Sequence, residues 1–162
     1  MHSQALHETV LPPTTRKALP ASRPRLRGAI IAAACWAVLA LSWSLTPRAA
    51  GFGTHEQLGL PPCSFLARTG YPCPSCGLTT SIAAMSRGRL LAAFNAQPFG
   101  VILFAAIAFF AVAATVQCLT GRDVVSALRP GTWWAFAALG GMLGGWGLKI
   151  AAGLATGELP IR

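Results

Sequence analysis

Three long apolar stretches, separated by more polar ones, dominate the pattern along this chain. No charged residue occurs within 28–45 or 98–119, and a third apolar run over 131–148 ends at Lys149. An α-helix rises about 1.5 Å per residue, so about 20 apolar residues cross a hydrocarbon core about 30 Å thick. The pattern therefore predicts three transmembrane helices, the third running over about 131–150.

Residues near the ends of these stretches are typical of a membrane interface. Pro98 suits the first turn of a helix, because its missing N–H would have no partner there. Trp43 and the Trp133–Trp134 pair lie where indole rings favour the headgroup level. Lys149 can bury its aliphatic stem while its ammonium reaches the interface, so we expect the third helix to continue beyond it.

Composition agrees with this interpretation. Hydrophobic residues make up 54% of the 162 residues and charged residues only 10%, against about 25% charged residues in soluble domains. So few charges cannot cover a folded surface in water, so lipid must replace part of the solvent. We predict an all-α membrane protein with one membrane domain over 28–154, a disordered basic tail over 1–27 and a short tail over 155–162.

The net charge of +9 is concentrated before the first membrane helix. The basic residues of this tail are Arg16, Lys17, Arg23, Arg25 and Arg27. No nucleic-acid motif accompanies them, so a cytoplasmic anchor against anionic lipid is favoured over nucleic-acid binding. Because the first helix usually sets orientation, we predict a multi-pass plasma-membrane protein with a cytoplasmic N-terminus and the loop over 46–97 on the outer face.

The loop over 46–97 is the longest connection and the place where function is expected. Leu78, Ile82 and Met85 recur in it at helical spacing, and a second short apolar face follows over 90–94. We therefore predict one or two short amphipathic helices lying along the membrane surface.

Five cysteines are present, and two of them, Cys35 and Cys118, lie in predicted membrane helices, where free cysteine behaves as a small apolar residue. The other three, Cys63, Cys73 and Cys76, lie in the loop. Prolines and a glycine around the last two favour a tight turn that leads into a helix. A helix N-terminus stabilises a thiolate, which lowers the pKa of the cysteine and raises its reactivity.

The loop cysteines admit several chemistries. Cys73 and Cys76 can form a dithiol–disulfide couple, or Cys63 can pair with one of them as a structural bridge. The three thiols can also bind zinc, with His55 as a candidate fourth ligand. A purely structural turn, whose thiols fill space beneath a helix, is the remaining alternative.

A specific pattern runs from Cys63 to Gly100. It contains a cysteine, Thr-Gly, a Cys-Pro-x-Cys-Gly-x-Thr motif, a short helix with a glycine, and an entry to the next membrane helix. The residues that carry it are Cys63, Thr69, Gly70, Cys73, Pro74, Cys76, Gly77, Leu78, Thr79, Gly88, Ala93, Phe94, Asn95 and Pro98. In these residues the chain resembles the bacterial membrane-protein family that carries the domain of unknown function 2752.

The resemblance implies a membrane setting and a cysteine motif, but it implies no reaction. The family pattern commonly has an arginine where this chain has Thr80. The resemblance therefore implies for this chain no activity that depends on that arginine, such as anion binding or thiolate stabilisation.

Glycines in the third helix form two overlapping Gly-x-x-x-Gly pairs, which are Gly140 with Gly144 and Gly141 with Gly145. Such pairs let helices approach closely in lipid, and here they predict either packing against the chain's own helices or homodimerisation.

No polar constellation beyond the cysteines is evident, so we expect a structural, partner-binding or assembly role rather than an enzyme. The alternative is a membrane thiol–disulfide oxidoreductase, or a metal-binding protein, that uses Cys73 and Cys76. A transporter is least favoured, because ionisable side chains normally mark ion paths and none lies between the helix ends.

Overall fold

The computed structural model describes residues 22–128, 131–157 and 159, and every regular element within these ranges is a helix. Three helices are long and apolar enough to cross a membrane: α1 (Ser22–Ser44), α5 (Pro98–Thr120) and α7 (Trp133–Thr156). The shorter elements are η1 (Thr54–Leu58), α2 (Ser64–Thr69), α3 (Leu78–Ser86), α4 (Leu90–Ala96) and α6 (Val124–Ala127). The predicted fold class, with three membrane helices and short helices in the first loop, is confirmed.

Two helix boundaries differ from the sequence-based ranges. Helix α1 begins at Ser22 rather than near residue 28, because Pro24 is tolerated in a first turn and arginine is a good helix former. Helix α7 continues to Thr156, beyond Lys149. The predicted tail lies outside the described residues over 1–21, as do residues 158 and 160–162 of the C-terminal tail.

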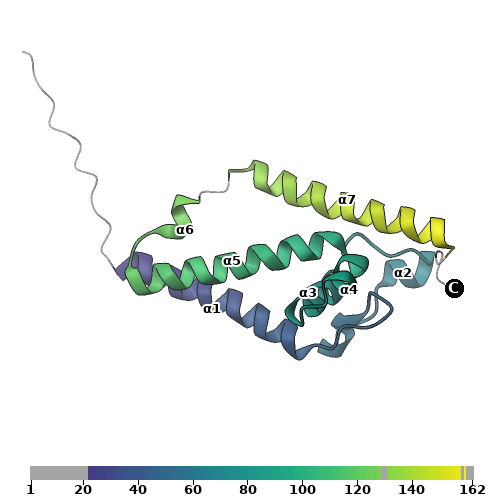
Figure 1. Ribbon diagram of the computed structural model, residues 1–162, viewed down its shortest axis with the longest axis horizontal. Coiled ribbons are helices and arrows are strands. Elements are labelled where there is room, and N and C mark those ends of the chain that lie inside the picture. Colours follow the sequence, from purple (N-terminus) through teal and green to yellow (C-terminus); the bar gives the residue numbers. More distant parts are fainter. Residues whose placement is uncertain (1–21, 129–130, 158, 160–162) are drawn as a thin grey trace, which may run out of the picture.

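Helices α1 and α5 lie side by side along their length and run in opposite directions (Figure 1). Gly28 allows the two backbones to touch, since a Cβ there would lie 2.8 Å from the Cys118 nitrogen. Near the same end of the pair, the buried Gln117 amide donates to the Pro24 carbonyl at 2.9 Å. Small side chains and these polar contacts therefore bring the pair together.

The loop elements gather at the other end of this pair, where α1 ends and α5 begins (Figure 1). Arg87, the residue after α3, donates hydrogen bonds to the Trp43 carbonyl at 2.6 Å and to the Leu45 carbonyl, and its guanidinium lies 5.8 Å from the Trp43 ring centroid. A cation is favoured at a helix C-terminus by the helix dipole. Arg87 thus caps α1 and fixes α3 against it.

Helix α7 is arranged differently, because it diverges from α5 at its N-terminal end and meets it near the loop (Figure 1). Gly141 and Gly145 face Phe99, and a Cβ at Gly141 would lie 3.0 Å from that ring. A Cβ at Gly140 or Gly144 would meet nothing within 4 Å. One predicted glycine pair thus packs against the chain itself, while homodimerisation through the other stays a prediction.

Candidate functional site: a cluster of three thiols

The three loop cysteines come from two neighbouring segments. Cys63 is the residue before α2. Cys73 and Cys76 form a tight turn before α3, in which the Cys76 N–H donates to the Cys73 carbonyl at 2.9 Å. Gly77 completes the turn with a φ of +93°, a conformation that favours glycine. A Cβ at this position would also collide with the carbonyl oxygens of Ala96 and Gly51.

Side chains from the membrane helices hold this turn in place. The Trp146 indole N–H of α7 donates to the carbonyl of the buried Pro72 at 2.7 Å. The Gln97 amide, at the start of α5, donates to the Pro74 carbonyl at 3.1 Å. Buried carbonyls need such partners, because an unpaired one costs about 1–3 kcal/mol. The cysteine turn is therefore anchored to two transmembrane helices.

The turn brings all three thiols together. The Sγ atoms of Cys63, Cys73 and Cys76 lie within 4.8 Å of one another. The Cys73 and Cys76 sulfurs are 3.2 Å apart, and the Cys73 sulfur is 3.3 Å from the Ser75 hydroxyl oxygen. Cys76 is only 7% exposed, whereas Cys63 and Cys73 are partly exposed. A pocket of about 210 Å³ opens beside Cys63 and Cys76.

The two cysteines of the turn differ in acidity. Burial acts to raise the pKa of the Cys73 thiol, but hydrogen bonds from Ser75, Cys76 and Cys63 outweigh it and lower that pKa to about 7. Burial raises the pKa of Cys76 to about 12, and its hydrogen bond to Cys73 acts in the same direction. At neutral pH, Cys73 is therefore partly a thiolate while Cys76 keeps its proton, so Cys73 is the more acidic thiol of the pair.

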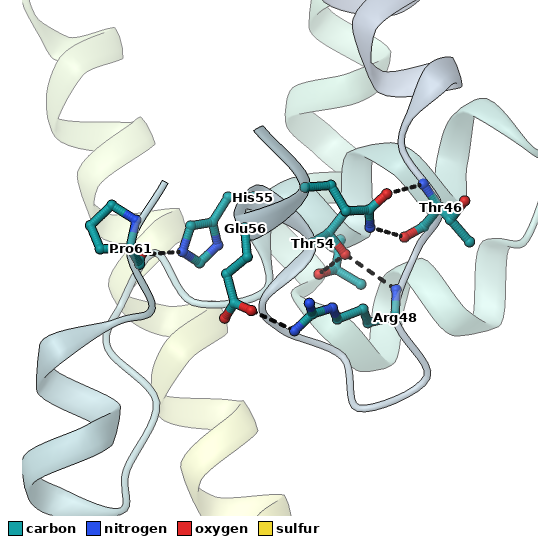
Figure 2. A network of polar contacts seen from close by, with 8 residues as sticks. Thr46, Arg48, Thr54, His55, Glu56 and Pro61 are labelled. Carbon is teal, nitrogen blue, oxygen red and sulfur yellow. Dashed lines mark hydrogen bonds and ion pairs between the residues drawn. The ribbon is translucent and has the colours of Figure 1, made fainter. Parts of the chain in front are cut away.

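His55 lines the same small pocket as Cys63 and Cys76, but it is not part of the group of three converging thiols. Its Nε2 atom is 3.2 Å from the Pro61 carbonyl oxygen, and the neighbouring Glu56 carboxylate pairs with Arg48 at 2.7 Å (Figure 2). Within the described residues, the donors that converge are three thiols with no imidazole among them. A metal held here would take three sulfur ligands from the chain, and His55 as a fourth ligand stays a prediction.

Thr80 occupies the position at which the resemblance predicted that an arginine is common. Its side chain is 2% exposed, and its hydroxyl is 2.8 Å from the hydroxyl of the fully buried Thr54. Thr54 in turn accepts a hydrogen bond from the Arg48 backbone N–H at 3.2 Å (Figure 2). In this chain the position therefore joins α3 to η1 and carries no charge to the thiols.

Sequence reasoning overlooked several residues that position the site, among them Ser75, Gln97 and Trp146. Ser75 was visible as the polar residue between the two cysteines of the turn. Trp146 and Lys149 are three residues apart, a spacing that places both on one face of α7. A tryptophan and a lysine on one face of an otherwise apolar helix could have indicated that this face contacts hydrogen-bond acceptors, as it does at the Pro72 and Ala96 carbonyls.

Residues 63–111 match the family model described as "Protein of unknown function (DUF2752)". The resemblance to this family is confirmed over that segment, which contains all three loop cysteines and the first part of α5. No curated protein and no solved structure matches the chain.

Proposed function

We propose that this membrane protein is a thiol–disulfide exchange protein that acts on the cysteines of a partner. The observation that carries the proposal is the pairing of a partly exposed Cys73 with a buried Cys76 at a sulfur–sulfur distance of 3.2 Å. An exposed thiol can attack a partner, while a buried thiol next to it is shielded until a mixed disulfide forms. The lowered pKa of Cys73 agrees with this division of roles.

The exchange proceeds in two steps. The Cys73 thiolate attacks one sulfur of a partner disulfide, whose S–S bond breaks, and the departing partner sulfur takes up a proton. Cys76 then attacks the Cys73 sulfur and loses its proton to the second departing partner sulfur. The partner gains two electrons and two protons, and the chain is left with a Cys73–Cys76 disulfide. The same steps in reverse oxidise a partner dithiol.

The geometry is compatible with this chemistry. A disulfide bond is about 2.05 Å long, so the two sulfurs must approach each other by about 1 Å, within the reach of side-chain rotation. The basic residues before α1 and in its first turns support a cytoplasmic N-terminus, which would put the cysteine turn on the outer face of a plasma membrane, where disulfides persist. An assembly role follows if the partner is another membrane or secreted protein.

A three-sulfur metal site is the second candidate, because a dithiol couple does not need the third thiol that Cys63 brings within 4.8 Å. Thiolates favour Zn²⁺ and Cu⁺. Tetrahedral zinc would take its fourth ligand from water or from a partner, whereas monovalent copper is satisfied by three sulfurs.

Mass spectrometry of the purified full-length chain, equilibrated with glutathione buffers of graded potential, tests the main proposal. We expect a reversible loss of two hydrogens that is retained in Cys63→Ser and abolished when Cys73→Ser or Cys76→Ser is added to Cys63→Ser. A couple that does not cycle at any physiological potential would overturn the proposal. Native mass spectra of the reduced chain with Zn²⁺ or Cu⁺ test the second candidate, for which Cys63→Ser must weaken binding as strongly as the other two variants.

The pH dependence of alkylation tests the nucleophile. The rate of Cys73 modification by iodoacetamide should rise with pH and reach half its maximum near pH 7, because the thiolate is the reactive form. Ser75→Ala removes a hydrogen bond that lowers this pKa, so its half-maximum should move to higher pH. Ser86→Ala, on α3 but outside the cluster, is the matched control. An unshifted profile in Ser75→Ala would remove Ser75 from the site.

A further inference from the structure

A larger cleft of about 830 Å³ lies between α7, α4 and the segment that follows α1. It is distinct from the small pocket beside the thiols, and it is lined by Leu148 and Ala152 of α7 and by Phe52 and Phe94 from the loop. Its volume falls within the range of about 300–1,000 Å³ that is typical of small-molecule sites. The apolar lining suits a ligand that is partly hydrocarbon.

The polar part of the cleft is cationic. Arg48, Arg89 and Lys149 line it, and none of the lining side chains that the structure describes is acidic. The only ion pair within the described part of the chain joins Arg48 to Glu56. The Lys149 amine donates to the Ala96 carbonyl at 2.6 Å and lies 6.0 Å from the Phe52 ring centroid, and the Cys76 and Cys73 thiols are close enough for their negative charge, when ionised, to act on it. Arg89 and Lys149 therefore have no carboxylate partner among the described residues.

The position of the cleft matches the headgroup level of a membrane. Its lining residues come from elements at the end of the bundle where α1 ends and α5 begins, and Figure 1 shows how these elements are arranged. The half-exposed Trp43 and the Arg87 guanidinium that lies over it occupy the same end, as side chains at a membrane interface do. No residue in the most apolar stretch of α7 is buried, so this helix offers an open hydrocarbon-compatible face beside the cleft.

We propose that this cleft binds the phosphate of an anionic phospholipid, whose acyl chains lie along α7. Charge complementarity selects an anion, since Lys149 and Arg89 line the cleft and neither forms an ion pair within the described residues. The exposed Asn95 amide at the rim can donate to phosphate or glycerol oxygens. The apolar lining and the adjoining membrane helix select a lipid over a free anion, because only a lipid buries hydrocarbon there.

Native mass spectrometry of the full-length chain in detergent, titrated with phosphatidylglycerol or phosphatidylcholine, tests the proposal. We expect the anionic lipid to bind more tightly, and each cation removed to weaken it about fivefold, from an attraction of about 1 kcal/mol for each Lys or Arg. Arg89→Gln and Lys149→Gln should each show this loss. Arg68→Gln, which removes an exposed cation of α2 outside the cleft, should not.

If Lys149→Gln fails to fold, Arg89→Gln still tests the lipid site, because the Arg89 side chain is exposed and its replacement should not disturb folding. Equal binding of the two lipids would overturn the proposal, as would equal losses in Arg68→Gln and Arg89→Gln. Displacement of the lipid by millimolar inorganic phosphate would show a site for free anions instead of lipid and would overturn it as well.

Discussion

Helix α1 packs along the length of α5, whereas α7 meets α5 only near Phe99 and is joined to the rest of the molecule at the loop end. In the first pair, Gly28 brings two backbones into contact. In the second case, Trp146 and Lys149 reach backbone carbonyls of the loop and of the residues before α5. Helices α1 and α7 are both apolar enough to cross a membrane, but they are held to the rest of the molecule by different interactions.

The difference follows from the solvent. Lipid chains are as apolar as leucine, so apolar contact alone does not drive two membrane helices together. A close pair needs either small residues, which permit many van der Waals contacts, or hydrogen bonds that lipid cannot replace. Helices α1 and α5 use mainly the first, and α7 uses mainly the second. Because its hydrogen bonds end on and around the cysteine turn, the attachment of α7 depends on that turn.

Among the changes considered, Gly77→Ala should most strongly destabilise the attachment of α7 to the cysteine turn. A residue with a Cβ pays about 1–2 kcal/mol in the left-handed conformation, and here the Cβ would also collide with the Ala96 and Gly51 carbonyls. We expect the free energy of unfolding in mixed micelles to fall by about 4 kcal/mol, with overpacking supplying about 2 of these. The half-maximum of Cys73 alkylation should also return towards the pH of an ordinary thiol.

Gly88→Ala is the matched control, since Gly88 has a φ of +70° but open space around its Cβ position. Gly88→Ala should lower the free energy of unfolding only by the cost of the left-handed conformation, about 1–2 kcal/mol. The pH dependence of Cys73 alkylation should stay unchanged. Equal losses in the two variants would mean that the close approach at Gly77 contributes nothing.

Gly28→Leu should have the next largest effect, on the α1–α5 side. A Cβ would lie 2.8 Å from the Cys118 nitrogen and 2.9 Å from the Ala114 oxygen, so the helices must separate. We expect a loss of about 3 kcal/mol in the free energy of unfolding, the upper range for overpacking. Gly144→Leu, on the open face of α7, should leave the monomer's stability unchanged, and it would disrupt a homodimer if that face forms one. A larger loss of unfolding free energy in Gly144→Leu than in Gly28→Leu would show that close packing matters more for α7 than for the α1–α5 pair.

Hydropathy was enough to predict the three membrane helices, because a bilayer demands long charge-free runs whatever their packing. The position of Lys149 was less predictable. A snorkelling lysine and one that donates to the Ala96 carbonyl have the same sequence pattern, and only the fold places that carbonyl within reach. Likewise, nothing in the sequence indicates that Arg87 would cap α1, a helix that ends more than forty residues earlier.

In the candidate site, too, some features could be predicted from the sequence and others depend on the fold. Prolines and a glycine predicted that Cys73 and Cys76 lie in a tight turn, since that closeness is local. The approach of Cys63 to them is a tertiary contact that depends on how α2 returns to α3. His55 had the right chemistry for a fourth ligand; its ring lies beside the Pro61 carbonyl and lines the pocket next to Cys63 and Cys76, so its role stays a prediction. Residue type alone carries no information on such distances.

Trp146→Phe should have the smallest effect of the three and the one most specific to α7. It keeps most of the aromatic ring but removes the indole N–H, which leaves the buried Pro72 carbonyl without that donor. We expect the free energy of unfolding to fall by about 1 kcal/mol and backbone hydrogen exchange to accelerate in the last turns of α7 and in the cysteine turn, but not in α1. Trp134→Phe, which alters an exposed indole stacked on Trp133, should change neither quantity. Faster exchange throughout α1 and α5 in Trp146→Phe would show that the three helices unfold as one unit. The packing of α1 on α5 and the attachment of α7 to the loop would then not differ in stability.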